Sequence, residues 1–407
     1  MIQKEAGITA PIGFEAAAYA AGIKYQGRTD MALVYSKVPC KKAGTFTSNV
    51  VKAAPVLWDK AVVEQSADAQ AIIINSGIAN ACTGKQGMDC CKAQAKEAAA
   101  ALNIREDAVL IASTGVIGMQ IPIDKITHGI GELAGKKEAS LQAGLEAAKA
   151  IMTTDTVYKQ GSISVTIGGK KVTLGGMCKG SGMIHPDMCT MLGFVTTDAA
   201  ISEELLKKAV KKCVDDSFNR ISVDGDTSTN DTFLVLANGL AGNAEMTQED
   251  ADFEAFYQAL LELCIYLAKK MAGDGEGATA LIEAKVIHAA SREDARLLSK
   301  AVICSSLTKA AIFGHDANWG RILCALGYSG AIFDPEKVDL YFESDKGKIL
   351  LFSNGCPQNY SEEEATAILS EKEVRILADM HMGEASACAW GCDLSYDYVR
   401  INADYRS

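Results

Sequence analysis

The chain has 407 residues, a hydrophobic fraction of 48% and a formal net charge of −11. This much apolar material is enough for a large folded core and excludes an intrinsically disordered chain. Lysine and arginine are interspersed with aspartate and glutamate without a basic run, which argues against a nucleic-acid partner. At roughly 100–200 residues per domain, the length predicts two domains or one large layered body.

The first half of the chain is predicted to alternate strands and helices. In chain order we expect strands at 32–36 and 71–74, a helix at 88–102, a strand at 108–112 and a helix at 139–152. Two segments of alternating polarity, 163–167 and 171–174, then flank Gly168-Gly169. That pattern predicts a β-hairpin.

The second half continues the alternation. We expect a glycine-rich loop at 175–186, a buried strand at 191–195, a helix at 203–216, a strand at 232–237, a helix at 250–271 and a strand at 338–342. Mixed strands and helices with a hairpin predict an α/β or α+β layered fold rather than a purely parallel sheet.

The 13 cysteines bear on the compartment. The N-terminal segment lacks the pattern of a signal peptide, and no apolar stretch is long enough to cross a membrane, so we expect reduced thiols in a cytoplasmic protein. Cys388 and Cys392, with Cys356 nearby in sequence, lack the tight paired spacing of zinc ligands. The five histidines form no metal-binding motif. We therefore expect no metal and a metal-free mechanism.

The glycine-rich loop leads to Thr190, which on its own reads as an ordinary strand threonine. Thr190 would become a nucleophile if the Cys189–Thr190 peptide bond were cut, because the freed α-amine would act as its base. An α-amine pKa near 7.7–8.0 suits that role at neutral pH. The cut would be an N→O acyl shift followed by hydrolysis of the ester.

The turn Ser113-Thr114-Gly115 follows the strand at 108–112. The Thr114 hydroxyl and the Gly115 N–H could both point at a developing oxyanion, and a purely structural turn is the alternative. The glycine-rich run at 175–180 lacks the lysine and hydroxyl ending of a phosphate-binding loop, and the run at 273–277 places acidic residues where phosphates would sit. No nucleotide cofactor is expected from them.

The run KGSGMIHPDMCTMLGFVTTDA at 179–199 closely resembles the self-cleaving glutamate N-acetyltransferase family, also called ornithine acetyltransferase. The resemblance extends over nearly the whole chain. Further matching motifs are NSGIANACTG (75–84), STGVIG (113–118), MTTDT (152–156), SFNRISVDGDTSTNDT (217–232), GDGEGAT (273–279), DANWGRI (316–322) and YVRINADYRS (398–407).

The resemblance implies a layered α/β sandwich of the self-processing, N-terminal-nucleophile kind. Residues 1–189 and 190–407 would be α and β chains that share one intertwined body, assembled as α₂β₂. Thr190 would be the nucleophile, Cys189–Thr190 the cleaved bond, and Thr114 and Gly115 the oxyanion hole. The implied substrate-binding residues are Thr153, Lys179, Thr190, Glu276, Asn402 and Ser407.

The implied reaction transfers acetyl from N-acetylornithine to glutamate in arginine biosynthesis, with no cofactor. The resemblance leaves open whether acetyl-CoA is also a donor. An amidase or aminopeptidase of the related self-processing class is one alternative, and an uncleaved metabolite-binding protein is another. The chain departs from the family pattern at Ile78, His185 and Cys189, and Ser407 stands where threonine is usual.

Overall fold

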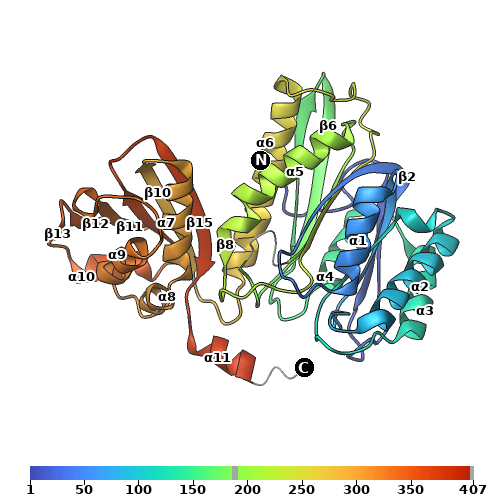
Figure 1. The fold of residues 1–407 in the computed structure, drawn as a ribbon, viewed down its shortest axis with the longest axis horizontal. Coiled ribbons are helices and arrows are strands. Elements are labelled where there is room, and N and C mark those ends of the chain that lie inside the picture. The colour runs from blue at the N-terminus through green and yellow to red at the C-terminus, as the bar shows by residue number, and fades with distance from the viewer. Residues whose placement is uncertain (186–190, 404–407) are drawn as a thin grey trace.

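The computed structural model describes residues 1–185 and 191–403, and it has two lobes (Figure 1). The larger lobe is built on an eight-stranded sheet and the smaller one on a seven-stranded sheet. Cys189, Thr190 and Ser407 lie outside the described residues. Among the described residues, no helix combines the length and the apolar character needed to cross a membrane.

The larger sheet runs in the order β4-β3-β2-β9-β7-β6-β5, with β1 paired to β2. Its strands are β1 (Phe14–Tyr19), β2 (Met31–Phe46), β3 (Ala69–Asn75), β4 (Val109–Ser113), β5 (Lys159–Ile167), β6 (Lys170–Lys179), β7 (Leu192–Thr197) and β9 (Thr232–Ala237). The long strand β2 pairs with β1 and β3 along its first half and with β9 along its second. It therefore links two halves of the sheet.

The two halves pack face to face, with helices outside each. Alternate residues of β3 show this, because Ile72 and Ile74 share a core with Phe194 and Leu234 of the other half. Ile73 instead packs with α2 and α3. The helices of this lobe are α1 (Ala54–Gln65), α2 (Gly84–Leu102), α3 (Ile123–Lys136), α4 (Leu141–Ala150), α5 (Glu203–Asp216) and α6 (Ala251–Gly273).

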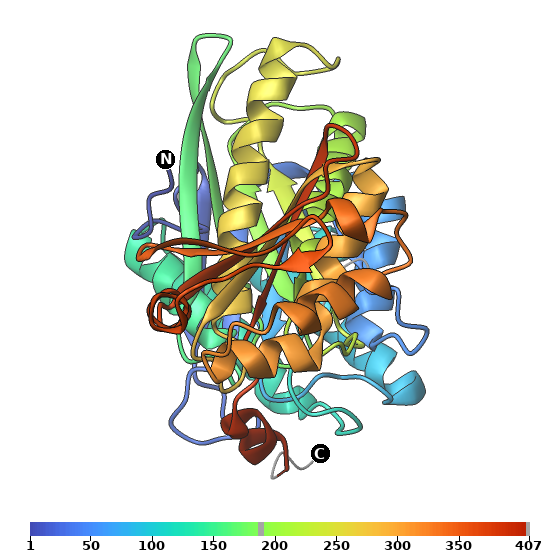
Figure 2. The same cartoon turned by 90° about the vertical axis from the view of Figure 1, so that its left-hand side faces the viewer.

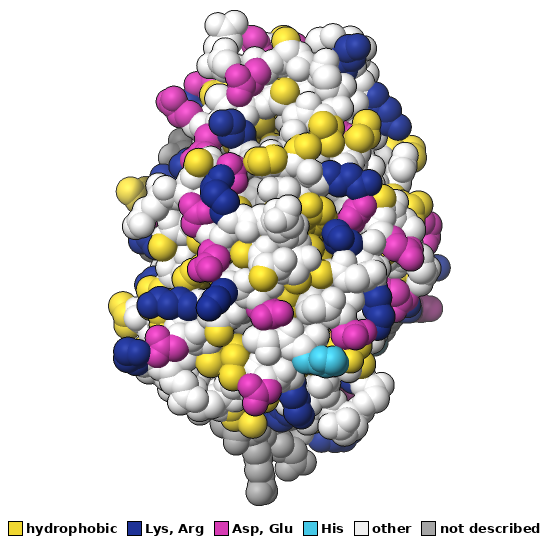
Figure 3. All heavy atoms as spheres, turned by 90° about the vertical axis from the view of Figure 1, so that its right-hand side faces the viewer, with side chains coloured by type: hydrophobic (Ala, Val, Ile, Leu, Met, Phe, Trp, Pro, Cys, Tyr) yellow, Lys and Arg dark blue, Asp and Glu magenta, His cyan; other side chains and the backbone are white. Residues whose placement is uncertain are grey.

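The opposite outer layer is formed by α5 and α6, which cover β5, β6, β7 and β9 through a large apolar core. Figure 1 shows α5 and α6 on one side of the strands and α2 and α3 on the other. The order helix, sheet, sheet, helix confirms the predicted layered α/β sandwich. On the outer face on the α2 and α3 side, acidic and basic side chains are interspersed without a dominant basic patch (Figure 3).

The smaller lobe has the strand order β13-β12-β11-β14-β10-β15-β8. Figure 2 views the molecule from the side of this lobe, whose strands lie in front of α6. Its strands are β8 (Ile221–Ser222), β10 (Leu281–Ala289), β11 (Asp339–Ser344), β12 (Gly347–Ser353), β13 (Cys356–Pro357), β14 (Glu373–Asp379) and β15 (Ala385–Cys392). Its helices are α7 (Arg292–Cys304), α8 (Ser306–Phe313), α9 (Trp319–Gly327) and α10 (Glu362–Leu369), and α11 (Tyr396–Ala403) follows the sheet.

The predicted hairpin is confirmed as β5 and β6, but the predicted loop at 175–186 is wrong at its start. Residues 175–179 belong to β6, which pairs with β5 and β7 on its two sides. Glycine is needed in this strand because a Cβ on Gly175 would lie 2.0 Å from the Gly7 carbonyl oxygen. Gly175 therefore permits a close backbone approach rather than a turn.

Candidate active site

One pocket, lined mainly by the larger lobe, collects the described residues that the sequence assigned to catalysis and substrate binding. Its lining includes Thr114, Gly115, Thr153, Lys179, Glu276 and Asn402. These residues come from the end of β4, the loop after α4, the end of β6, the loop after α6, and α11. Ile184 and Met191, on either side of the undescribed residues 186–190, line the same pocket.

The turn after β4 is held in shape by the segment that follows β3. The Thr114 N–H donates to the Asn75 carbonyl at 3.0 Å, and the Val116 N–H donates to the Gly77 carbonyl at 3.1 Å. Gly115 has a φ of +127°, and a Cβ there would lie 2.3 Å from the Gly77 carbonyl carbon. Only glycine fits this position.

A buried amide network supports the same turn. The Ser113 hydroxyl donates to the Asn75 side-chain oxygen at 2.6 Å. The Asn230 amide donates to the carbonyls of Ala79 and Ser113 at 2.6 and 2.8 Å. Ile78 forms β-bridges to Thr114 and Val116, and its side chain packs in the core under α2 and α3. Ile78 therefore has a packing role in this turn.

Lys179 joins the turn to a buried charge network. Its Nζ lies 3.5 Å from the Thr114 hydroxyl oxygen and 3.8 Å from a carboxylate oxygen of Asp155. Burial lowers the pKa of Lys179, and the Asp155 carboxylate opposes that shift. The Lys179 ammonium is therefore held close to the predicted oxyanion turn by a fixed negative charge.

The network beneath Lys179 was not predicted from the sequence. Lys159 donates to Asp155 at 2.7 Å and to Asp274 at 2.6 Å, and its side chain is fully buried. Burial favours a higher pKa for Asp155, but the charges of Lys179 and Lys159 outweigh it and hold that pKa well below its usual value. Asp155 also accepts from the N–H groups of Thr153 and Gly180. It thus fixes two pocket-lining residues.

Glu276 is a buried carboxylate in the lining of the same pocket. Its Oε2 accepts a hydrogen bond from the Asn402 amide at 2.8 Å, and its N–H donates to the Ser181 carbonyl at 3.0 Å. Gly182 packs directly against it, because a Cβ at that position would lie 2.4 Å from the Glu276 carboxyl carbon. Asn402 lies in α11, so the C-terminal segment is helical as far as Ala403.

Asp231 is a further pocket-lining carboxyl group that the sequence analysis did not select. Burial raises its pKa well above the usual value, against hydrogen bonds from Ser228 and Thr47. No described residue hydrogen-bonds to its Oδ2. The only signal in the sequence was an acidic residue immediately before the strand at 232–237.

His185 lies apart from this pocket lining. Its Nδ1 is 3.0 Å from the Ser222 hydroxyl and 3.6 Å from the Cys304 sulfur. It lines a separate surface hollow with Arg220 and Lys300. The departure at His185 therefore lies outside the described lining of the pocket.

A second pocket adjoins the first and shares Gly115, Thr153 and Thr154 with it. It adds two basic side chains, Lys24 and Arg28, and the carboxyl group of Asp30, which accepts from the N–H groups of Ala21 and Ile23. The Arg28 guanidinium donates to the carbonyl oxygens of Met152 and Thr153. The first pocket thus carries Glu276 and Asp231 with Lys179, and the second carries Lys24 and Arg28 with Asp30.

The possible metal ligands lie elsewhere. Cys356 is on β13 and the other two thiols, Cys388 and Cys392, are on β15, with four strands between them in the sheet order, so they do not form one site. Among the described residues, the His/Cys/Asp/Glu group compatible with a metal ion is His288, Asp379 and His381, and none of these lines either pocket.

Comparison with known proteins shows which family the chain resembles. Residues 15–407 match the ArgJ family. The chain is 53% identical over 403 residues to the arginine biosynthesis bifunctional protein ArgJ of Symbiobacterium thermophilum, covering 98% of each protein. It is 51% identical over 398 residues to the protein of the same name from Thermotoga neapolitana, covering 98% of this chain and 99% of that one.

The chain is also similar to a solved structure of a protein with the same name. The crystal structure of the arginine biosynthesis bifunctional protein argJ from Bacillus halodurans is 50% identical, with a TM-score of 0.51, over 53% of this chain and 100% of that chain. The match over nearly the whole sequence and the high identity to several relatives agree with the resemblance in the motifs. The chain belongs to the ArgJ family.

Proposed function

We propose that this protein is a glutamate N-acetyltransferase of arginine biosynthesis, acting in the cytoplasm. It transfers the acetyl group of N-acetyl-L-ornithine to L-glutamate through an ester on Thr190. The observation that carries the proposal is that Thr114, Gly115, Lys179 and Glu276 line one pocket. Ile184 and Met191, which precede and follow the segment that contains Thr190, line the same pocket. The names of the close relatives in arginine biosynthesis support it.

Maturation would begin with attack of the Thr190 hydroxyl on the Cys189 carbonyl carbon. The peptide C–N bond breaks, the α-amine of Thr190 takes up a proton, and water hydrolyses the ester to a Cys189 carboxylate. The solved relative from Bacillus halodurans is fully covered by about half of this chain, which is the size of a piece that begins at residue 190.

The pieces would remain together after such a cut, because β6 and β7 come from its two sides and are hydrogen-bonded neighbours. Strand β9 also pairs with β2 across the same division. We propose that residues 1–189 and 190–407 stay as α and β chains of one body and assemble as α₂β₂.

Acetyl transfer would follow a two-step course. Thr190 Oγ attacks the acetyl carbonyl carbon, the Thr114 hydroxyl and Gly115 N–H stabilise the oxyanion, and ornithine leaves with a proton from the Thr190 α-amine. The glutamate amine then attacks the ester and Thr190 regains its proton. Ester hydrolysis is the competing reaction, so the pocket must hold the acceptor in place of water.

The charged side chains of the pocket are complementary to the charges of the proposed substrates. The Lys179 ammonium offers a compact positive charge to a substrate carboxylate, and Glu276 offers a negative charge to the ornithine ammonium. Thr153 and Asn402 would position the substrate through polar contacts. Ser407 is proposed to join them, although it lies outside the described residues.

Acetyl-CoA is a second candidate donor. The close relatives are named bifunctional, and the adjoining pocket offers the cations of Lys24 and Arg28 at a place suited to phosphate groups. Formation of N-acetylglutamate from acetyl-CoA and glutamate would support this second activity. Its loss in Arg28→Gln, with transfer from N-acetylornithine retained, would assign the activity to this pocket.

The first experiment combines denaturing mass spectrometry with a transfer assay. Two masses corresponding to 1–189 and 190–407, and N-acetylglutamate formed from N-acetylornithine, are the expected results. Thr190→Ala should stay as one chain and lose transfer. Full transfer by Thr190→Ala would refute the proposal, and release of acetate without a need for glutamate would instead favour the amidase or aminopeptidase alternative. One uncleaved and inactive wild-type chain would favour a binding protein.

A further inference from the structure

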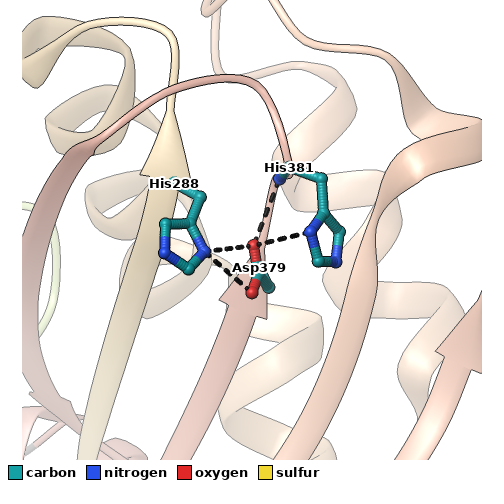
Figure 4. A group of neighbouring side chains, drawn as sticks. All are labelled: His288, Asp379 and His381. Atoms are coloured by element: carbon teal, nitrogen blue, oxygen red, sulfur yellow. Dashed lines mark hydrogen bonds and ion pairs between the residues drawn. The ribbon is translucent and has the colours of Figure 1, made fainter.

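Two histidines and an aspartate meet at one edge of the smaller lobe (Figure 4). His288 lies near the end of β10, Asp379 ends β14, and His381 follows two residues later. Strands β10 and β14 are parallel and pair Ile287 with Asp379, so their carboxyl ends lie side by side. The sequence spacing of these residues gave no sign of this arrangement.

The three side chains point toward one another. The His288 Nδ1 lies 2.8 and 2.9 Å from the two carboxylate oxygens of Asp379. The His381 Nδ1 lies 3.5 Å from Asp379 Oδ1. One ligand atom from each residue lies within 4.8 Å of the other two. This separation suits a shared cation, since zinc binds nitrogen and carboxylate ligands at about 2.0–2.2 Å.

A fourth residue orients one of the histidines. Asp339 begins β11, which pairs with β14 on the side away from β10. Its Oδ2 lies 2.9 Å from the His381 Nε2. A carboxylate that accepts from one imidazole N–H fixes the tautomer and leaves the other nitrogen lone pair for a metal. In His381 that other nitrogen is the Nδ1 that faces Asp379.

The backbone holds both imidazoles in place. His288 and His381 have φ values of +52° and +49°, a region that few residues other than glycine adopt. The N–H groups of Met382 and Gly383 donate to the His288 carbonyl at 2.7 and 3.0 Å. The loop after β14 is therefore fastened to β10 beside the three ligand atoms.

The local charge also favours a cation. Within residues 1–185 and 191–403, neither Asp379 nor Asp339 forms an ion pair with lysine or arginine, and their partners are histidines. Both histidine side chains are 48% exposed, so an ion has access from solvent and water can complete its coordination.

We propose that His288, Asp379 and His381 bind one divalent transition ion of the zinc class, with Asp339 orienting His381. Two imidazoles and one carboxylate are a ligand set that zinc accepts, with water in the remaining position. The site is separate from the pocket of the proposed acetyl transfer. Its ion would clamp β10 to the loop after β14 and stabilise the smaller lobe.

The test is zinc binding by the untagged, full-length protein after removal of metal with a chelator. Equilibrium dialysis should find one more Zn²⁺ ion per chain in the wild type than in the double variant His288→Asn/His381→Asn. Asparagine is chosen because it tolerates the left-handed backbone, so the variant should fold. Zinc should raise the Tm of the wild type and not that of the double variant.

The controls separate this site from the cysteines and from other histidines. His315→Asn changes another exposed histidine of the smaller lobe, also with a φ of +52°, and should bind zinc as the wild type does. Asp339→Asn should weaken binding by roughly 10–100-fold. Equal zinc stoichiometry in the wild type and the double variant would overturn the proposal. Co²⁺ can replace Zn²⁺ as a spectroscopic probe of the ligands. The proposal would also be overturned if the Co²⁺ spectra of the wild type and the double variant were the same and showed only a thiolate band, because cysteines would then bind the ion.

Discussion

The Lys179 ammonium lies 3.5 Å from the Thr114 hydroxyl, which joins the proposed carboxylate anchor to the proposed oxyanion turn. The two residues are at the ends of β6 and β4, strands that belong to different halves of the larger sheet. A change in the position of Lys179 is therefore expected to affect both substrate binding and the chemical step. What fixes Lys179 is the buried network of Asp155, Lys159 and Asp274.

Asp155→Asn tests this network. The substitution removes the negative charge that compensates two buried lysines, so the free energy of unfolding should fall by about 3 kcal/mol. It should also raise the KM for N-acetylornithine, because Lys179 loses the carboxylate beside it. Urea unfolding and initial-rate assays measure the two effects.

Asp107→Asn is the matched control for Asp155→Asn. Asp107 pairs with Arg105 at the surface, where an ion pair is worth about 0–1 kcal/mol. The control should change the free energy of unfolding by less than about 1 kcal/mol and leave KM unchanged. Similar losses of stability in the two variants would show that the buried network contributes no more to the free energy of unfolding than a surface ion pair does.

Glu276→Gln tests the proposed recognition of the ornithine ammonium. The substitution keeps the shape and the hydrogen bond from Asn402 but removes the charge, so the KM for N-acetylornithine should rise by roughly 10–100-fold. The reaction of the acetyl-enzyme with glutamate should change less, because glutamate has no side-chain cation. Separate half-reactions with radiolabelled acetyl groups distinguish the two steps.

A matched substitution controls for loss of the local structure around Glu276. Asn402→Ala removes the hydrogen bond to Glu276 and the proposed polar contact of Asn402 with the substrate but keeps the Glu276 charge, so it should raise the KM for N-acetylornithine less than Glu276→Gln does. An equal effect of Glu276→Gln on both half-reactions would contradict an ammonium-specific role. It would assign Glu276 to the common chemistry instead.

Local sequence patterns predicted those parts of the fold that depend on neighbouring residues. The strand at 232–237 matches β9, and the hairpin about Gly168-Gly169 matches β5 and β6. The start of the loop at 175–186 was wrong, because the reason for glycine at 175 is the carbonyl of Gly7, a contact far away in sequence. Glycine usually indicates a turn, but here a tertiary contact requires it within a strand.

The candidate site shows the same limit. Family motifs led to Thr114, Gly115, Lys179 and Glu276, which the structure brings together. The Lys159 and Asp274 pair could not be predicted, since hydrophobic periodicity carries no information about which buried charges will meet. The histidine cluster was missed for a related reason, because its residues are joined by the register of β10 and β14.

Gly115→Ala tests the turn, with Gly118→Ala as its matched control. Both glycines have positive φ, at +127° and +84°, but only a Cβ at 115 would meet neighbouring backbone. Gly118→Ala should cost about 1 kcal/mol from the backbone conformation alone. Gly115→Ala must in addition displace Gly77, so it should cost more and should abolish transfer.

The measurement for this pair is thermal or urea unfolding together with a transfer assay. Gly118→Ala is expected to remain an active enzyme with a modestly lower Tm. If Gly115→Ala were as stable and as active as Gly118→Ala, the close approach of Gly115 to Gly77 would have no functional weight. The oxyanion role of this turn would then be untenable.

The pH dependence of stability should depend on Glu283, which connects the lobes. Glu283 on β10 pairs with Lys269 of α6 at 2.6 Å and with Arg375 of β14 at 2.6 Å, and it accepts from the Trp390 indole at 2.8 Å. Burial would raise the pKa of Glu283, but hydrogen bonds from Lys269 and Trp390 and the nearby cations outweigh it and lower the pKa to about 2.

Because the folded-state pKa is depressed, this stabilisation is present above the unfolded pKa of about 4.3 and is lost as the pH falls toward 2. Glu283→Gln should lower the free energy of unfolding at pH 7 by about 1 kcal/mol, a figure reduced for partial solvent screening, and should flatten its dependence on pH between about 4 and 2. Urea unfolding at a series of pH values measures this slope.

Glu373→Gln is the control for Glu283→Gln, because Glu373 is an exposed carboxylate on the neighbouring strand β14. Its variant should keep the wild-type slope. A wild-type slope in Glu283→Gln would mean that the contact between α6 and the smaller sheet does not depend on this charge. The apolar packing of Trp390 and Cys392 with the core around α6 would then be what holds the lobes together.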